Sequence, residues 1–95
     1  MYLESSMQSM TVEEREEAFT DVARLLDSAA LEAMIEGNRR FAIYSKNMAE
    51  AIRLNADELA REDARHAQRV MQQATDLIRQ FETVHPYRMR SHSVH

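Results

Sequence analysis

The chain has 95 residues, so it forms one domain at most, and a single copy can bury only a modest hydrophobic core. With one Gly, one Pro and no Cys, its composition favours long helices over sheets and excludes disulfides, zinc-thiolate sites and cysteine nucleophiles. The net charge of −4 is unevenly placed: residues 1–36 hold nine acids and two bases (−7), and the remainder holds ten bases and seven acids (+3). We therefore expect an all-α protein whose acidic first half can lie along its more basic second half, in the same chain or in another copy.

The sequence shows no signal for membrane insertion or export. It has no run of about 18 apolar residues. Residues 1–10 lack the basic flank and the apolar stretch of a signal peptide. We expect a soluble, cytoplasmic protein without a membrane span.

The first predicted element is an acidic helix from Val12 to Glu36. Residues 1–10 show no helical period, and we expect them to form a flexible N-terminal arm. Thr11 and Glu14 have the spacing of a capping box, in which each side chain accepts a hydrogen bond from the backbone N–H of the other residue. Many residues on the apolar face of the helix are Ala, so a neighbouring helix can approach closely. Gly37 follows the last periodic residue, which is the usual place of a left-handed helix end.

A second, longer helix is predicted from Arg39 to Glu82, because this stretch has no Gly or Pro and its apolar residues recur at helical spacing. The short link at residues 37–38 makes the two helices antiparallel, so residues 11–84 are predicted to form a helical hairpin. Asn55, followed by acids, resembles an internal helix start, and a break there would give three helices that fold on themselves. The apolar stripe keeps its phase through Asn55, however, and we expect a continuous helix that is at most kinked there.

The lengths of the two helices differ, at about 37 Å and about 66 Å, so the far end of the longer one would have no partner in its own chain. Monomers rarely leave such a stripe in water, and we expect a symmetric dimer in which two hairpins form a four-helix bundle or the long helices pair. The stripe steps average about 3.6 residues, which indicates straight helices with little coiled-coil supercoiling. The predicted interface residues are Phe41, Tyr44, Met48, Ile52, Leu59, Val70, Leu77, Ile78 and Phe81. After Glu82, Pro86 ends the helix, and residues 85–95 are expected to be a flexible basic tail.

These features predict a small oligomerising interaction protein, an adaptor or chaperone-like subunit, whose partner is itself or a heterologous helical protein. In size and outline it resembles the secreted helical hairpins of type VII systems and the small chaperones of type III secretion. It departs from the type VII motif, because no Trp stands two residues before Gly37 and Ser91, not an acid, stands four residues after Tyr87. We expect no enzyme activity, because the Ser residues have no placed base and there is no Gly-rich phosphate loop.

A group of carboxylates with one His provides an alternative. Asp63 and Glu62 stand three and four residues from His66, so the imidazole shares a helix surface with either carboxylate. The stretch resembles the ferritin-like di-iron proteins, which place Glu-x-x-His on a helix facing Glu residues, and the shortened encapsulated ferritins among them. The resemblance implies a ferroxidase-like site for iron or manganese between subunits, although Asp63 stands where the pattern has Glu. Its candidate ligands are Glu32, Glu36, Glu62, Asp63 and His66. The alternative without a metal is a polar pair that fixes helix register.

A row of arginines is a weaker candidate for nucleic-acid binding. Arg61, Arg65 and Arg69 are spaced four apart, and such a row could follow a phosphate backbone. Acids such as Asp57 and Glu58 interrupt it, and the chain is acidic overall. The pattern therefore favours a salt-bridged, solvated face, and nucleic acid is not an expected partner.

Overall fold

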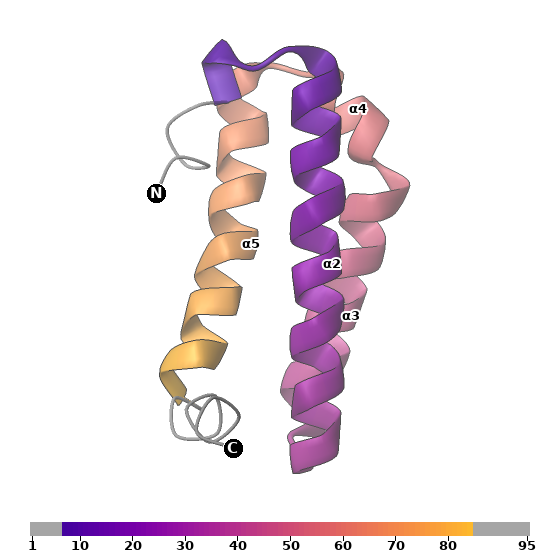
Figure 1. The fold of residues 1–95 in the computed structure, drawn as a ribbon, viewed down its shortest axis with the longest axis vertical. Helices are drawn as coiled ribbons and strands as arrows, with labels where there is room; N and C mark the ends of the chain where they lie inside the picture. Colours follow the sequence, from indigo (N-terminus) through magenta and orange to yellow (C-terminus); the bar gives the residue numbers. More distant parts are fainter. Residues whose placement is uncertain (1–6, 85–95) are drawn as a thin grey trace, which may run out of the picture.

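The computed structural model describes residues 7–84, with side chains up to residue 82. The predicted all-α class is confirmed, and the described residues contain no strand. The elements are a 3-10 turn η1 (Met7–Ser9) and the helices α2 (Val12–Glu36), α3 (Arg39–Leu54), α4 (Ala56–Arg61) and α5 (Ala64–Val84). Figure 1 shows three helical arms side by side: α2 runs in one direction, α3 with α4 returns along it, and α5 reverses again beside α2. The flexible tail predicted for residues 85–95, and the part of the N-terminal arm at 1–6, lie outside the described residues.

The ends of α2 are set by local interactions, as the sequence predicts. The capping box is present: the Thr11 N–H donates to Glu14 Oε1 at 2.9 Å, and the Glu14 N–H donates to Thr11 Oγ1 at 3.1 Å. At the other end Gly37 has the left-handed φ of 86°, and the Asn38 N–H donates to the Ala33 carbonyl at 2.8 Å. The Asn38 side chain then accepts from the Phe41 N–H at 3.3 Å, which starts α3.

The prediction of a flexible arm over residues 1–10 is wrong for its last residues. Met7 is completely buried in the main core. Arg15, on the first turns of α2, holds this segment in place, because its Nε donates to the Met7 carbonyl at 2.8 Å. Its Nη1 donates to the Ala60 carbonyl at 3.2 Å, so one guanidinium joins η1 to the last turn of α4.

The prediction of a continuous helix from Arg39 to Glu82, at most kinked near Asn55, is wrong at Glu62–Asp63, where the chain reverses. The chain breaks twice, first at Asn55, whose side chain donates to the Ala51 carbonyl at 2.7 Å and ends α3. This break bends the arm without reversing it. The reversal comes at Glu62–Asp63, where Glu62 is extended and the Asp63 carbonyl accepts from the N–H groups of His66 and Ala67 at 3.0 and 3.1 Å. The reversal sends α5 back along α2.

Folding α5 back produces the main hydrophobic core. Phe19, Val22 and Leu26 of α2 pack with buried residues of α3 and α5. The core residues of the other two arms are Ala49, Ile52, Ala56, Ala67, Met71, Ala74 and Leu77. This burial is the physical reason for the reversal, since a straight continuation would leave the α5 residues in water. Burial of apolar surface here outweighs the helix propensity of the 55–63 stretch.

The predicted interface stripe is thus largely covered within one chain. Ile52, Leu77 and Phe81 are buried, and Tyr44 is the exposed member. The other five members, Phe41, Met48, Leu59, Val70 and Ile78, are partly buried against the core. The premise of the predicted dimer, an uncovered far end of a long helix, is therefore incorrect. Dimerisation itself stays a prediction.

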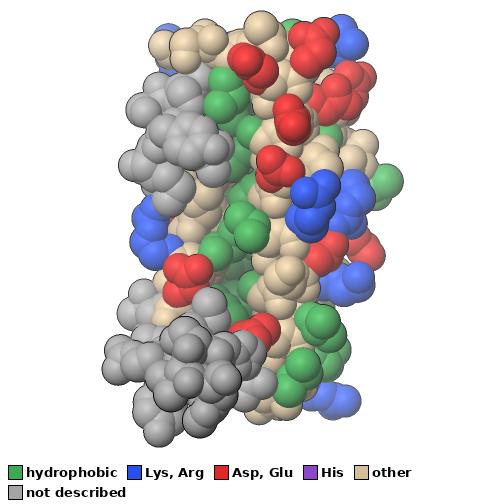
Figure 2. Space-filling model, in the orientation of Figure 1, with side chains coloured by type: hydrophobic (Ala, Val, Ile, Leu, Met, Phe, Trp, Pro, Cys, Tyr) green, Lys and Arg blue, Asp and Glu red, His purple; other side chains and the backbone are tan. Residues whose placement is uncertain are grey.

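Polar contacts between α2 and α3 agree with the charge division of the sequence. Asp27 of the acidic α2 forms an ion pair with Arg53 of α3. The buried Ser45 hydroxyl of α3 donates to the Leu26 carbonyl of α2 at 2.8 Å. Figure 2 shows acidic side chains over the upper part of α2, and apolar side chains in the seam between α2 and α5. None of the described helices is long and apolar enough to cross a bilayer.

Candidate helix-binding groove

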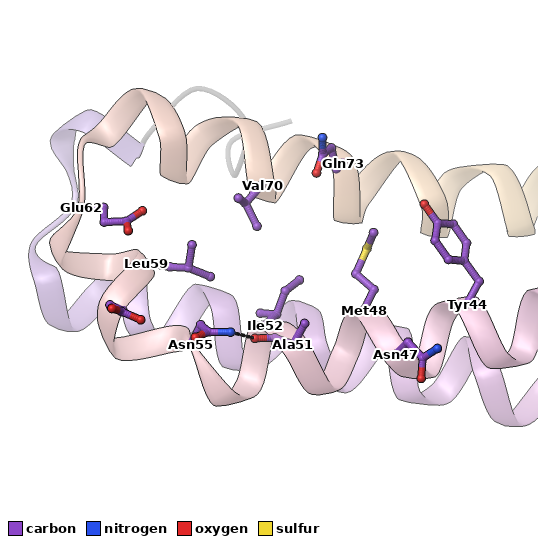
Figure 3. A pocket seen from close by; sticks show the side chains of 11 residues that line it. Tyr44, Asn47, Met48, Ala51, Ile52, Asn55, Leu59, Glu62, Val70 and Gln73 are labelled. Atoms are coloured by element: carbon purple, nitrogen blue, oxygen red, sulfur yellow. Dashed lines mark hydrogen bonds between the residues drawn. The ribbon is translucent and has the colours of Figure 1, made fainter.

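A groove separates the arm made by α3 and α4 from α5. Its stretch nearer the chain reversal is a cavity of about 470 Å³, walled by Met48 and Ile52 of α3, Leu59 of α4 and Val70 of α5. Figure 3 shows Tyr44, Met48 and Ile52 reaching from α3 toward α5, with Val70 pointing back at them. A second cavity of about 520 Å³ lies at the Phe41–Phe81 end. Because Tyr44 lines both cavities, we treat them as one surface, the α3–α5 groove.

The stripe predicted from the sequence supplies the walls of this groove. Eight of the nine predicted interface residues line one or other of the two cavities. The exception is Ile78, which lines a smaller cavity of about 250 Å³ with Leu25, between α2 and α5. The predicted residues are thus brought together, but as two facing walls and not as one continuous stripe.

The polar lining of the groove was not predicted. Asn47, Asn55 and Gln73 line the first cavity, and Asn38 and Gln80 line the second. Apart from Asn55, which resembles a helix start, these residues follow no apolar period and form no motif, so they could not be predicted from the sequence. The Asn55 motif was the one sign in the sequence that α3 ends at this point, so that the last part of the groove is lined by residues after α3.

The charges in the groove lie at its two ends. Glu58 and Glu62 line it at the α4 end, and Arg40 lines it at the start of α3. Glu62 Oε1 lies 3.4 Å from His66 Nε2, a pair that is charged on both sides only when the imidazole is protonated. The side chains of Glu58 and Arg40 form no ion pair with another described residue. The groove is therefore apolar in its walls, neutral and polar along its edges, and acidic at one end.

The predicted metal ligands are divided between the two ends of the molecule. Glu32 and Glu36 lie in the last two turns of α2, whereas Glu62, Asp63 and His66 lie at the α4–α5 reversal. The reversal lies beside the start of α2, because Arg15 of α2 donates a hydrogen bond to the Ala60 carbonyl of α4. Glu32 lies 17 residues after Arg15 in α2, which is a distance of about 25 Å at the helical rise.

Only Glu62 and His66 are brought together as predicted. Within one copy, no group of three or more His, Asp or Glu side chains among the described residues is placed to hold a metal ion. An iron or manganese site built by two copies stays a prediction.

The predicted arginine row is divided by the chain reversal. Arg61 lies in α4 and its Nε is 3.0 Å from Asp57 Oδ1, whereas Arg65 and Arg69 lie in α5. The three arginines therefore do not form one row along a single helix. Arg65 and Arg69 are exposed one turn apart, and nucleic-acid binding stays an untested prediction.

Comparison of the chain with protein-family models, with curated proteins and with solved structures yields no match in any of the three.

Proposed function

We propose that this chain is a helical interaction protein, an adaptor or chaperone-like subunit, that binds one amphipathic helix of another protein in the α3–α5 groove. The observation that supports this proposal is the groove itself, whose two walls are apolar stripes on separate helical arms. A helix of the partner laid between α3 and α5 would cover the parts of each stripe that the chain itself leaves exposed. Recognition of this kind uses apolar anchors at positions i, i+3 or i+4, and i+7 of the bound helix.

The dimensions of the groove fit a short helix. Its wall runs from Arg40 to Glu58, or about 27 Å at the helical rise, which corresponds to about five turns of a bound helix. Each Leu-sized anchor that becomes fully buried contributes about 1.5–3 kcal/mol before the costs of association. Met48, which is flexible and partly buried, can adjust its side chain to different anchors.

Two neighbouring residues of α3 provide a matched test. Tyr44 is 57% exposed and lines the groove, and Ile43 is 58% exposed and does not line it. Binding of an 18-residue amphipathic peptide with a Leu stripe should weaken at least ten-fold in Tyr44→Glu, because a carboxylate would be buried against the apolar stripe. Ile43→Glu should bind like the unmodified chain. Fluorescence anisotropy of the labelled peptide measures both, and equal weakening by the two substitutions would contradict the proposed site.

A further inference from the structure

We infer that the helix bound in the α3–α5 groove carries Lys or Arg at the end that lies against Glu58 and Glu62. This inference rests on the proposed function and names the chemistry of the partner. Three of the residues that line the groove are charged, and the two acids among them, Glu58 and Glu62, stand one helical turn apart at the same end. The third, Arg40, lies about 27 Å away, beyond the screening length of about 8 Å in physiological salt. The acidic end therefore acts on a partner independently of Arg40.

The residues around Glu58 and Glu62 do not neutralise both carboxylates, so this end of the groove favours a cation. Arg61 lies next to Glu62 in sequence but its guanidinium is held by Asp57 at 3.0 Å. His66 approaches Glu62 from α5 at 3.4 Å, and Asp63 and Arg65 add one charge of each sign at the reversal. Glu58 is exposed and has no ion pair with a described residue. A cationic side chain on the partner would meet Glu58 directly and Glu62 on the following turn.

The same charges argue against α2 of a second copy of this chain as the occupant. The exposed apolar residues on the last turns of α2 are Leu31, Met34 and Ile35. They lie among Asp27, Glu32 and Glu36 in the sequence. Binding of α2 from another copy would therefore bring carboxylates into a groove that already has Glu58 and Glu62 at one end. Like charges placed together at an interface disfavour that pairing.

The chain's own basic tail also fits the groove poorly. Residues 85–95 follow α5, which ends beside the second cavity where Arg40 lies. The two arginines of the tail would therefore begin at the Arg40 end of the groove, opposite Glu58 and Glu62. A helix of another protein is the occupant that satisfies both the apolar walls and the acidic end.

Three peptides with the same Leu stripe test the inference with the full chain. They differ in one pair of residues at one end, which is Lys-Lys, Gln-Gln or Glu-Glu. We expect the Lys peptide to bind about three- to ten-fold more tightly than the Gln peptide at low salt, and the Glu peptide to bind more weakly than both. The preference should shrink as salt rises. In Glu58→Gln/Glu62→Gln the three affinities should converge, whereas Glu50→Gln, which removes an acid outside the groove, should leave them unchanged.

The outcomes separate the inference from the function on which it rests. If the three peptides bind equally and without salt dependence, the charge preference is overturned and the groove remains a helix-binding site. If none of them binds, the proposed function is overturned. Self-association of the chain that Tyr44→Glu abolishes and Ile43→Glu does not would identify a second copy as the occupant, which also overturns the inference. Salt dependence is measured on the unmodified chain, so the test does not depend on how the variants fold.

Discussion

Phe41, at the start of α3, stacks on Phe81, near the end of α5, with ring centroids 4.8 Å apart and ring planes at 17°. The two residues are 40 positions apart in the sequence, and their contact joins the arms at the end of the groove opposite to the chain reversal. Both rings also line the second cavity. The contact thus holds the two walls together where neither a turn nor a helix connects them.

Phe81→Ala should destabilise the fold by about 3 kcal/mol, because it removes a side chain that is 4% exposed and leaves a cavity beside Phe41. Urea unfolding followed by circular dichroism measures the free energy of unfolding. Phe81→Leu is the control, and its free energy of unfolding should fall by less, since Leu keeps most of the buried volume. A loss below about 1 kcal/mol in Phe81→Ala would show that the stacking contact adds little to the packing of α5.

Gly37→Ala should cost about 1 kcal/mol of stability, and the cause should be backbone strain alone. The φ of 86° is left-handed, while a Cβ added at this position would meet no atom within 4 Å. Gly37→Asn should cost less, because Asn adopts this conformation more readily. Thermal and urea unfolding of the two variants check the order, and equal losses would contradict the strain explanation.

Arg15→Met should lower the free energy of unfolding by about 1–2 kcal/mol, since it removes the hydrogen bonds to the carbonyls of Met7 and Ala60 but keeps the apolar stem. Amide hydrogen exchange should also accelerate in η1 and in the last turn of α4. The matched control is Arg24→Met, which removes an exposed pair with Asp21 inside α2 and should change stability by less than about 0.5 kcal/mol. Similar losses in both variants would mean that Arg15 does not fasten the two segments.

Any iron or manganese bound by this protein should depend on association of two copies, because Glu32 and Glu36 lie about 25 Å along α2 from the end that holds Glu62 and His66. Metal analysis of untagged protein, separated by size and purified without added metal, should therefore find metal only in an associated fraction. His66→Ala should remove it. Stoichiometric metal in a fraction of single copies would contradict the separation of these residues in the fold.

Local signals in the sequence determined the helical class and the ends of the first helix. The capping box at Thr11 and Glu14 and the left-handed turn at Gly37 each depend on residues within four or five positions of one another. Interactions over so short a distance are nearly independent of the rest of the chain, and for that reason they could be predicted. The periodic apolar residues could be predicted as well, and eight of the nine chosen as an interface do line the groove.

The tertiary structure alone decided which of these residues face one another. The apolar stripe is in phase across residues 55–63, so periodicity predicts one long helix, whereas burial of Ala67, Met71 and Ala74 against α2 requires the reversal at Glu62–Asp63. The burial of Met7 likewise depends on contacts with residues far along the chain. The reversal created the groove, separated the predicted metal ligands and divided the arginine row. Contacts between distant segments outweigh local propensity here, because removing a whole helix face from water contributes more free energy than one helical turn costs to break.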